Sequence, residues 1–322
     1  MSERAVVWIP RRLSAATIER ARRDYEVVLG VDDTPFDSDA IVSMSERVDA
    51  IVPCHSEVFD AVTVDRLHDR LKIVANHSVG VDHCDLAALS RRDIVVTNTP
   101  GVLDDATAEI AMLLLLGAAR RASEGDRLVR SGQWDAWSPS FMVGTQVTGA
   151  RLGILGMGRV GQVVARRARG FDMQVHYHNR TRLPAEREQG AIWHDSVESL
   201  FEVSDFLSLN APATGDTRGV LNATSIDWLP SGAIVVNTAR GALVDESALH
   251  EALVTGRLAA AGLDCFADEP GGNPALAALD NVFLLPHIGS ATRATRDAMG
   301  ACALDNLDAF FAGRAVPNPV GG

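Results

Sequence analysis

Short apolar runs alternate with segments of helical spacing along almost the whole chain. Between these runs, segments such as Thr17–Arg23 and Val62–Arg70 have the spacing of amphipathic helices. Strands that alternate with helices in this way predict a parallel sheet covered by helices. In the first hundred residues the predicted buried strands are Ala5–Ile9, Ala50–Pro53, Ile73–Ala75 and Ile94–Thr97.

A second series of strands and helices begins at Arg151. A series of this length around one glycine-rich turn is typical of a complete dinucleotide-binding domain. The sequence therefore predicts an α/β protein with two parallel sheets. In this second half the predicted strands are Leu152–Leu155, Gln174–His178, Phe206–Leu209, Ile234–Asn237, Gly262–Asp264 and Val282–Leu284.

The segment between the two series predicts one long helix over Asp104–Arg130. Its apolar run, Ile110–Ala119, is too short for a bilayer crossing, which needs about 20 residues, so we expect a buried helix. The following segment, Gly132–Gly149, contains two tryptophans and a phenylalanine. Because aromatic residues are common at interfaces, it is interpreted as an arm that docks on a partner subunit, or else as a loop packed on its own domain. A last helix is predicted over Thr292–Phe311.

Composition narrows the class of protein. A chain of 322 residues has room for about two domains. Its formal net charge of −12 argues against sequence-independent nucleic-acid binding. The four cysteines are scattered without metal-site spacing, which favours a reducing compartment. The N-terminal residues have no apolar leader, so we expect a cytoplasmic protein that does not interact with membranes.

A glycine-rich turn carries the signal for a cofactor. The run Gly156-Met157-Gly158-Arg159-Val160-Gly161 follows the strand Leu152–Leu155 and begins a predicted helix, Val160–Gly170. The first glycine permits a tight turn, the second lets the backbone approach a pyrophosphate, and the third lets helix and strand pack closely. The amides of the helix N-terminus can then bind the phosphate. This motif predicts a dinucleotide cofactor.

The next strand distinguishes between the two nicotinamide cofactors. An enzyme that uses NAD usually has Asp or Glu at the end of this strand to bind the ribose hydroxyls. Here the strand Gln174–His178 is followed by Asn179-Arg180-Thr181-Arg182. No carboxylate repels a 2′-phosphate, and two guanidinium groups with a hydroxyl can bind it. The sequence predicts a preference for NADPH, and use of NAD is the alternative. A less specific interpretation is that the two arginines are only solvated and do not select a cofactor.

Three polar residues near the ends of predicted strands can perform the reduction of a 2-keto acid. Arg240 can bind the carboxylate and polarise the carbonyl. His287 can donate the proton to the carbonyl oxygen, and Glu269 can orient its ring. Singly, each is more often a surface charge or a structural residue. Their order after the dinucleotide motif favours catalysis.

Four motifs together resemble the D-isomer-specific 2-hydroxyacid dehydrogenase family. They are Gly153–Gly161, Asn237–Gly241, Asp264–Pro270 and Pro286–Ser290, and the similarity extends to Ser78–Asp82 and Thr97–Gly101. Within the family the sequence is most similar to glyoxylate/hydroxypyruvate reductases, through Trp134–Pro139 and Gly289–Thr292 with Thr295-Arg296. The resemblance implies two Rossmann-like domains. The substrate-binding domain would comprise residues 1–101 and 288–322, and the dinucleotide-binding domain residues 102–287.

The resemblance also implies a site in the interdomain cleft of a homodimer. The catalytic residues would be Arg240, Glu269 and His287. The substrate would contact Ser78, Val79, Gly80, Arg240, His287 and Trp137, the last reaching the partner's active site. Further cofactor contacts would come from Thr107, Ala211, Pro212, Thr217, Thr238, Ala239, Asp264 and Gly289.

Two sets of histidines do not fit these roles. His77 precedes the substrate loop; we interpret it as facing solvent, the alternative being a donor to a hydroxylated substrate. His176 and His178 share one strand face, but no third ligand accompanies them, so no metal site is predicted.

The predicted function is reduction of glyoxylate or hydroxypyruvate to the D-2-hydroxy acid with NADPH. A reductase of a larger 2-keto acid, such as 2-ketogluconate or an arylpyruvate, would use the same residues. A non-catalytic protein that senses NAD(P)H is the alternative of a different class. The physiological acid, the direction of flux and any assembly beyond a dimer stay open at this point.

Overall fold

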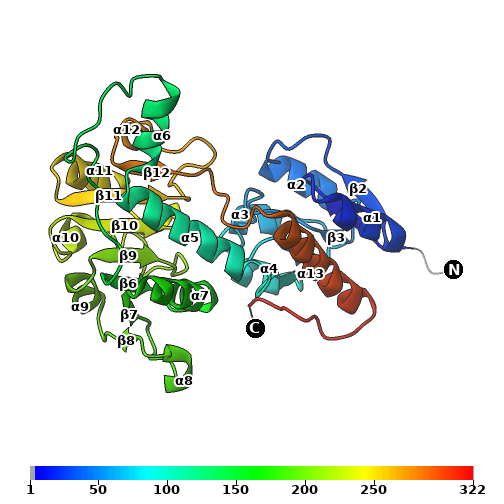
Figure 1. The fold of residues 1–322 in the computed structure, drawn as a ribbon. Helices are drawn as coiled ribbons and strands as arrows, with labels where there is room; N and C mark the ends of the chain where they lie inside the picture. The colour runs from blue at the N-terminus through cyan, green and yellow to red at the C-terminus, as the bar shows by residue number, and fades with distance from the viewer. Residues whose placement is uncertain (1–3, 322) are drawn as a thin grey trace. The chain divides into compact units, whose positions relative to one another are not determined.

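The computed structural model describes residues 4–321, and these fold into two α/β units (Figure 1). Unit 1 comprises Met1–Leu103 and Ser290–Gly322, and unit 2 comprises Asp104–Gly289. Every strand pairing within the two sheets is parallel, and helices cover both faces of each sheet. The predicted fold class is confirmed.

Unit 1 contains a five-stranded sheet with the order β2-β1-β3-β4-β5. Side chains that alternate along its strands pack against α1 and α13 on one face and against α2, α3 and α4 on the other. The strands are β1 (Val6–Ile9), β2 (Glu26–Leu29), β3 (Ala50–Ile51), β4 (Ile73–Ala75) and β5 (Val95–Thr97). The helices are α1 (Ala15–Asp24), α2 (Ser38–Ser45), α3 (Ala61–Asp65), α4 (Leu86–Arg91) and α13 (Arg293–Phe311).

Unit 2 contains a seven-stranded sheet with the order β12-β11-β10-β9-β6-β7-β8. Helices α5 and α7 cover one face, and α9 to α12 cover the other. The strands are β6 (Arg151–Leu155), β7 (Gln174–His178), β8 (Ile192–Trp193), β9 (Phe206–Leu209), β10 (Ala233–Asn237), β11 (Leu258–Leu263) and β12 (Val282–Leu284). The α-helices are α5 (Asp104–Ala119), α6 (Ala122–Arg130), α7 (Arg159–Ala168), α8 (Ala185–Glu188), α9 (Val197–Glu202), α10 (Ala223–Ile226), α11 (Glu246–Val254) and α12 (Pro274–Ala277), and two short 3₁₀ helices are η1 (Arg169–Phe171) and η2 (Gly241–Leu243).

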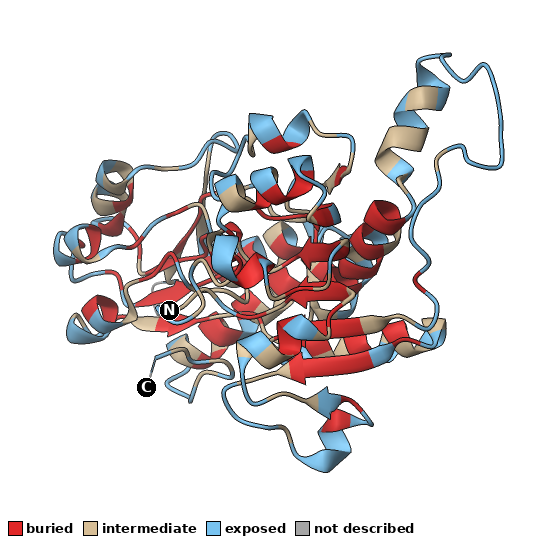
Figure 2. Cartoon of the chain, turned by 90° about the vertical axis from the view of Figure 1, so that its left-hand side faces the viewer, coloured by how far each residue is buried: buried red, intermediate tan, exposed pale blue. Residues whose placement is uncertain are grey.

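The long helix predicted over Asp104–Arg130 is interrupted. Arg121 adopts a left-handed backbone conformation with φ of +54°, which ends α5 and begins α6. Most of α5 is buried, as its apolar run predicted, whereas no residue of α6 is. The mainly exposed α6 and the segment after it contrast with the buried strands in Figure 2. None of the helices within residues 4–321 has both the length and the apolar character needed to cross a membrane.

Two strands were not predicted, and one was predicted too short. Strand β2 begins with an exposed glutamate and β8 is only two residues long, so neither shows the longer apolar run of a buried strand. Strand β11 begins at Leu258, four residues before the predicted start. The prediction missed these residues because alanine has little intrinsic preference for strands. Pairing with β10 and β12 stabilises it as a strand.

Helix α5 approaches the sheet of unit 2 closely at a glycine. A Cβ atom on Gly262 of β11 would lie 2.8 Å from the Cβ and 2.9 Å from the carbonyl oxygen of Leu114. Leu114 is fully buried, and the contact involves helix backbone, so a neighbouring side chain cannot simply rotate away. Gly262 therefore permits the helix-to-sheet spacing that closes this core.

We expect Gly262→Ala to destabilise unit 2 by about 1–3 kcal/mol through overpacking. This would lower its Tm by roughly 2–4 °C for each kcal/mol. The matched control is Gly170→Ala, because a Cβ there would meet no atom within 4 Å. Thermal unfolding followed by circular dichroism measures both variants. Equal Tm values for the two would contradict the close-approach argument.

Candidate active site

The carboxyl ends of the parallel strands of unit 2 carry most of the predicted functional residues. Because parallel strands end at one edge, residues that follow different strands are brought to the same side of the sheet. The glycine-rich turn follows β6, Asn179 to Arg182 follow β7, Ala211 and Pro212 come after β9, Thr238 to Arg240 follow β10, Asp264 follows β11, and His287 comes after β12.

The glycine-rich turn is packed so tightly that side chains would not fit at two of its glycines. Gly156 has φ of +93°, and a Cβ there would lie 2.6 Å from the amide nitrogen of Ala211. A Cβ on Gly161 would lie 2.4 Å from the carbonyl oxygen of Gly156. Gly158 begins α7 without a side-chain cap, and a Cβ there would meet nothing within 4 Å. The amides at the start of α7 therefore suit a phosphate group.

Two buried polar atoms at this edge also fit a polar ligand. Thr238 Oγ1 and Asn210 Oδ1 have no hydrogen-bond partner among residues 4–321. They follow β10 and β9, two adjacent strands of the sheet. Because buried polar atoms are normally hydrogen-bonded, this pattern and the uncapped α7 fit a dinucleotide cofactor.

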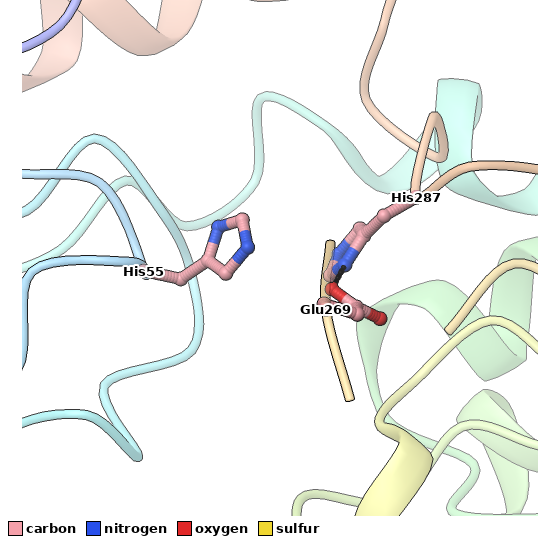
Figure 3. Close-up of side chains that lie close together, drawn as sticks. All are labelled: His55, Glu269 and His287. Atoms are coloured by element: carbon pink, nitrogen blue, oxygen red, sulfur yellow. Dashed lines mark hydrogen bonds and ion pairs between the residues drawn. The ribbon is translucent and has the colours of Figure 1, made fainter. Parts of the chain in front are cut away.

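Glu269 and His287 form the one close acid–base pair that the sequence predicted (Figure 3). His287 Nδ1 lies 2.5 Å from Glu269 Oε2, while Glu269 Oε1 accepts a hydrogen bond of 2.8 Å from the amide of Phe266. This second bond fixes the carboxylate. Both side chains stay partly exposed, at 29% for His287 and 21% for Glu269. With Nδ1 bound to the carboxylate, Nε2 is the ring atom that can exchange a proton with a ligand.

Asp264 holds the turn that carries His287. Its carboxylate is fully buried and accepts hydrogen bonds from the amides of Ile288, at 2.8 Å, and Gly289, at 2.7 Å. Burial raises the pKa of Asp264, and the two amide donors act in the opposite direction. His287 itself has a positive φ of 53°. Asp264 thus fixes the backbone directly after a residue in an unfavourable conformation.

Asn237 organises the segment that carries Arg240, although the sequence analysis gave it no role. The side chain is buried; its Oδ1 accepts a hydrogen bond from the amide of Ala239, and its Nδ2 donates to the carbonyl of Arg240. Arg240 Nη1 donates to the carbonyl of Ala239 at 2.7 Å. An asparagine at the end of an apolar strand was the available signal, because such a side chain can bind nearby backbone groups.

The four residues after β7 have different surroundings. Asn179 Oδ1 accepts a hydrogen bond of 2.7 Å from the amide of Met157 in the glycine-rich turn. Arg180 and Thr181 are exposed. Arg182 instead pairs with Glu188, through Nε to Oε1 at 2.7 Å and Nη2 to Oε2 at 3.1 Å. The four residues predicted to bind a 2′-phosphate therefore do not make equivalent contacts.

The remaining predicted residues of unit 2 differ in burial and in hydrogen bonding. Thr107 is buried, and a Cβ on Gly289 would lie 3.5 Å from its Oγ1. Thr217 Oγ1 donates to the carbonyl of Pro212 at 2.6 Å and so closes the loop after β9. Arg159 and Trp137 are exposed. Trp137 belongs to the segment that follows α6.

Unit 1 carries the predicted substrate loop after β4. Ser78 Oγ donates to the carbonyl of Gly80 at 2.7 Å, and Asn98 Nδ2 donates to the carbonyl of Val79 at 2.8 Å. The interpretation of His77 as facing solvent is wrong, because it is only 4% exposed. Burial, with the charge of Arg296 adding to the effect, lowers the pKa of His77 to about 4. His77 is therefore neutral near pH 7.

Comparison with known proteins gives the family. Residues 112–289 match the model for the D-isomer specific 2-hydroxyacid dehydrogenase, NAD binding domain. The chain is 45% identical over 303 residues to a glycerate dehydrogenase from Hyphomicrobium methylovorum, covering 94% of both proteins. It is 43% identical to a glyoxylate reductase from Thermococcus kodakarensis, covering 98% of this chain and 96% of the relative.

A solved structure supports the same family assignment. The NADPH-dependent glyoxylate/hydroxypyruvate reductase from Sinorhizobium meliloti, in complex with NADP and malonate, superimposes with a TM-score of 0.87. The two are 32% identical, and the alignment covers 99% of this chain and 97% of that one. This chain belongs to the D-isomer specific 2-hydroxyacid dehydrogenase family.

As a 2-hydroxyacid dehydrogenase, the protein is an oxidoreductase that binds a nicotinamide cofactor. The resemblance seen in the sequence is confirmed over nearly the whole chain. Small 2-keto and 2-hydroxy acids are the substrate class that the names of its relatives indicate.

Replacement of Asp264 tests how the dehydrogenase holds its histidine turn. Asp264→Asn keeps one acceptor oxygen and turns an NH₂ group toward an amide N–H, which we expect to cost about 1–3 kcal/mol of unfolding free energy. Asp245→Asn is the matched control. In Asp245 one oxygen, Oδ1, accepts both cap hydrogen bonds, from Ser247 and Ala248, so asparagine can replace it. Urea unfolding that gave the same stability for both variants would refute the role of Asp264.

Proposed function

We propose that this dehydrogenase reduces a small 2-keto acid to the 2-hydroxy acid, glyoxylate to achiral glycolate or hydroxypyruvate to D-glycerate, with NADPH preferred over NADH. The Glu269–His287 pair carries the proposal, because it is an oriented acid–base pair at the ligand-binding edge of the sheet. The names of the curated relatives, which include glyoxylate reductase and glycerate dehydrogenase, support the same substrate class.

In this proposal His287 supplies a proton from Nε2 to the carbonyl oxygen of the keto acid. Glu269 keeps the proton on Nδ1 and stabilises the charged ring, since its carboxylate lies 2.5 Å from that atom. Arg240 binds the substrate carboxylate and polarises the carbonyl through its planar guanidinium. In the oxidative direction His287 accepts the proton instead.

The cofactor supplies the hydride when bound, and the chain positions it. We assign its pyrophosphate to the turn Gly156–Gly161 with Arg159 and Val160 at the start of α7. We assign its nicotinamide to the group formed by Thr107, Thr238, Ala239, Asp264 and Gly289. The loop of Ala211, Pro212 and Thr217 is assigned to other parts of the cofactor. The group at Asn179 to Arg182 is assigned to the adenosine ribose.

The charge of that last group supports the proposed preference for NADPH. No carboxylate follows β7 until Glu186, and Asn179 is occupied with the amide of Met157. Arg180 has no ion-pair or hydrogen-bond partner for its guanidinium among the described residues, so it is available to a 2′-phosphate. An acidic residue at Asn179 would favour the ribose hydroxyls of NADH instead.

We assign unit 1 to substrate binding and unit 2 to dinucleotide binding. The substrate carboxylate would meet the backbone amides of the loop Ser78, Val79 and Gly80. We also propose a homodimer, with Trp137 acting in the partner's site. Support comes from the segment after α6, which exposes a series of large apolar side chains: Trp134, Trp137, Phe141 and Val143.

Initial rates with a panel of acids test the proposal. NADPH and NADH oxidation are each measured with glyoxylate, hydroxypyruvate, 2-ketogluconate and phenylpyruvate. We expect turnover of the two small acids, with kcat/KM at least about tenfold higher for NADPH, a difference of roughly 1.4 kcal/mol. Turnover of only 2-ketogluconate or phenylpyruvate would show that the substrate is a larger 2-keto acid. Binding of NADPH without turnover of any acid would favour a sensor.

Replacement of His287 tests the proton transfer. His287→Gln should lower kcat by about 10²- to 10⁴-fold, because glutamine cannot supply the proton. The Kd for NADPH, measured by fluorescence titration, should change little. His250→Gln, on α11, serves as the control and should keep full activity. Near-normal turnover of His287→Gln would exclude its role as the acid.

Replacement of Arg240 tests carboxylate binding. Arg240→Ala should raise KM and lower kcat together, with kcat/KM reduced roughly 10- to 100-fold, as expected for loss of hydrogen bonds to a charged group. Arg240→Lys should recover part of the loss, since it keeps the charge but not the planar fork. An unchanged KM for the keto acid in the alanine variant would show that another group binds the carboxylate.

A further inference from the structure

The loop segment Asn179–Leu183, which lies between β7 and α8, is held at one end by backbone amides of the glycine-rich turn and at the other by side chains of Tyr177 and Glu188. Its first residue is held by the glycine-rich turn, where Met157 donates its amide to Asn179 Oδ1 at 2.7 Å. The amide of Gly156 also donates to the carbonyl of His178, the last residue of β7, at 3.0 Å. The start of the loop is thus fixed to the turn assigned to the pyrophosphate.

The end of the loop is held by a hydrogen-bonded network of three side chains, those of Tyr177, Arg182 and Glu188. Tyr177, fully buried in β7, donates its hydroxyl proton to Glu188 Oε1 at 2.7 Å and accepts a hydrogen bond from the amide of Leu183 at 3.0 Å. Glu188 also accepts two hydrogen bonds from Arg182. Both the side chain of Arg182 and the backbone of Leu183 are therefore fixed.

Glu188 is the centre of this network. Its side chain is 9% exposed, whereas that of Arg182 is 61% exposed. The guanidinium of Arg182 also lies over the ring of Trp193 in β8, 5.8 Å from the centroid. Arg182, and after it Tyr177, hold the pKa of Glu188 below its ordinary value, so the carboxylate is charged at neutral pH.

Between the two anchors stand Arg180 and Thr181, whose side chains contact no hydrogen-bond or ion-pair partner within the described part of the chain. They are the two members of the predicted phosphate-binding group that are not already engaged. Glu188 already binds the guanidinium of Arg182 through two hydrogen bonds, so a phosphate would have to compete with this carboxylate for the same donors. Arg182 is therefore poorly suited to bind a phosphate directly.

We propose that Glu188, through Arg182 and Tyr177, is a positioning residue that holds Arg180 and Thr181 in place for the 2′-phosphate of NADPH. Selection of the phosphorylated cofactor then depends on a carboxylate that never contacts the cofactor. This inference rests on the proposed preference for NADPH. It reassigns Arg182 from a phosphate ligand to part of the support for the loop.

Binding of two nucleotide fragments tests this proposal without any turnover. The probes are 2′,5′-ADP, which carries the 2′-phosphate, and 5′-AMP, which lacks it. Isothermal titration calorimetry gives Kd for each with the full-length protein. Glu188→Gln is expected to weaken 2′,5′-ADP binding roughly tenfold by letting the loop move and to change 5′-AMP binding less than twofold. Glu186→Gln, an exposed glutamate on the same helix, is the matched control and should bind both as the unaltered protein does.

Arg182→Gln separates positioning from direct binding. If Glu188 positions the loop, Glu188→Gln and Arg182→Gln both weaken 2′,5′-ADP binding. If Arg182 were a phosphate ligand that Glu188 restrains, Arg182→Gln would weaken binding while Glu188→Gln would tighten it or leave it unchanged, and the proposal would be overturned. If Glu188→Gln proves unfolded by circular dichroism, Tyr177→Phe, which removes only the hydroxyl, must show the same selective loss, and unchanged binding in that variant overturns the proposal.

The same titrations distinguish two kinds of failure. If the unaltered protein binds 2′,5′-ADP no more tightly than 5′-AMP, the preference for NADPH is wrong, and the positioning role is wrong with it. If the unaltered protein discriminates and the Glu188 variant discriminates equally, only the positioning role is wrong.

Discussion

The turn that carries His287 depends on one buried carboxylate, which neither binds the substrate nor transfers a proton in the proposed reaction. Asp264 accepts the amides of Ile288 and Gly289 and so fixes the turn in which His287 has a positive φ. Burying a carboxylate is costly unless hydrogen bonds compensate for the lost hydration, and here two amides do so. The turn that Asp264 holds directly follows His287, whose Nδ1 lies 2.5 Å from Glu269.

The same arrangement recurs around the edge of the sheet. Asn237 fixes the segment of Arg240, and Asn179 ties the loop after β7 to the glycine-rich turn. In each case a short polar side chain at a strand end satisfies backbone groups of a neighbouring loop. The residues proposed to act on ligands therefore stand on loops whose backbones are fixed by other side chains. Such support is what precise catalytic geometry requires.

The sequence was sufficient to predict the fold class and the Glu269–His287 pair, because apolar periodicity and strand-end motifs are local signals. It was insufficient where a long-range partner determines the outcome. Arg182 belonged to an apparent phosphate-binding group until Glu188, six residues later and buried, proved to pair with it. His77 is polar, yet the structure buries it. The edge strand β8 likewise depends on its pairing with β7.

The central claim, reduction of a small 2-keto acid to the D-2-hydroxy acid with NADPH, is tested most directly by the chirality of the product. Hydroxypyruvate is reduced with NADPH, and the glycerate formed is resolved on a chiral column. The proposed function predicts that the product is D-glycerate, formed at the rate of NADPH oxidation and lost in His287→Gln. L-Glycerate, a racemic product, or the absence of glycerate would contradict it.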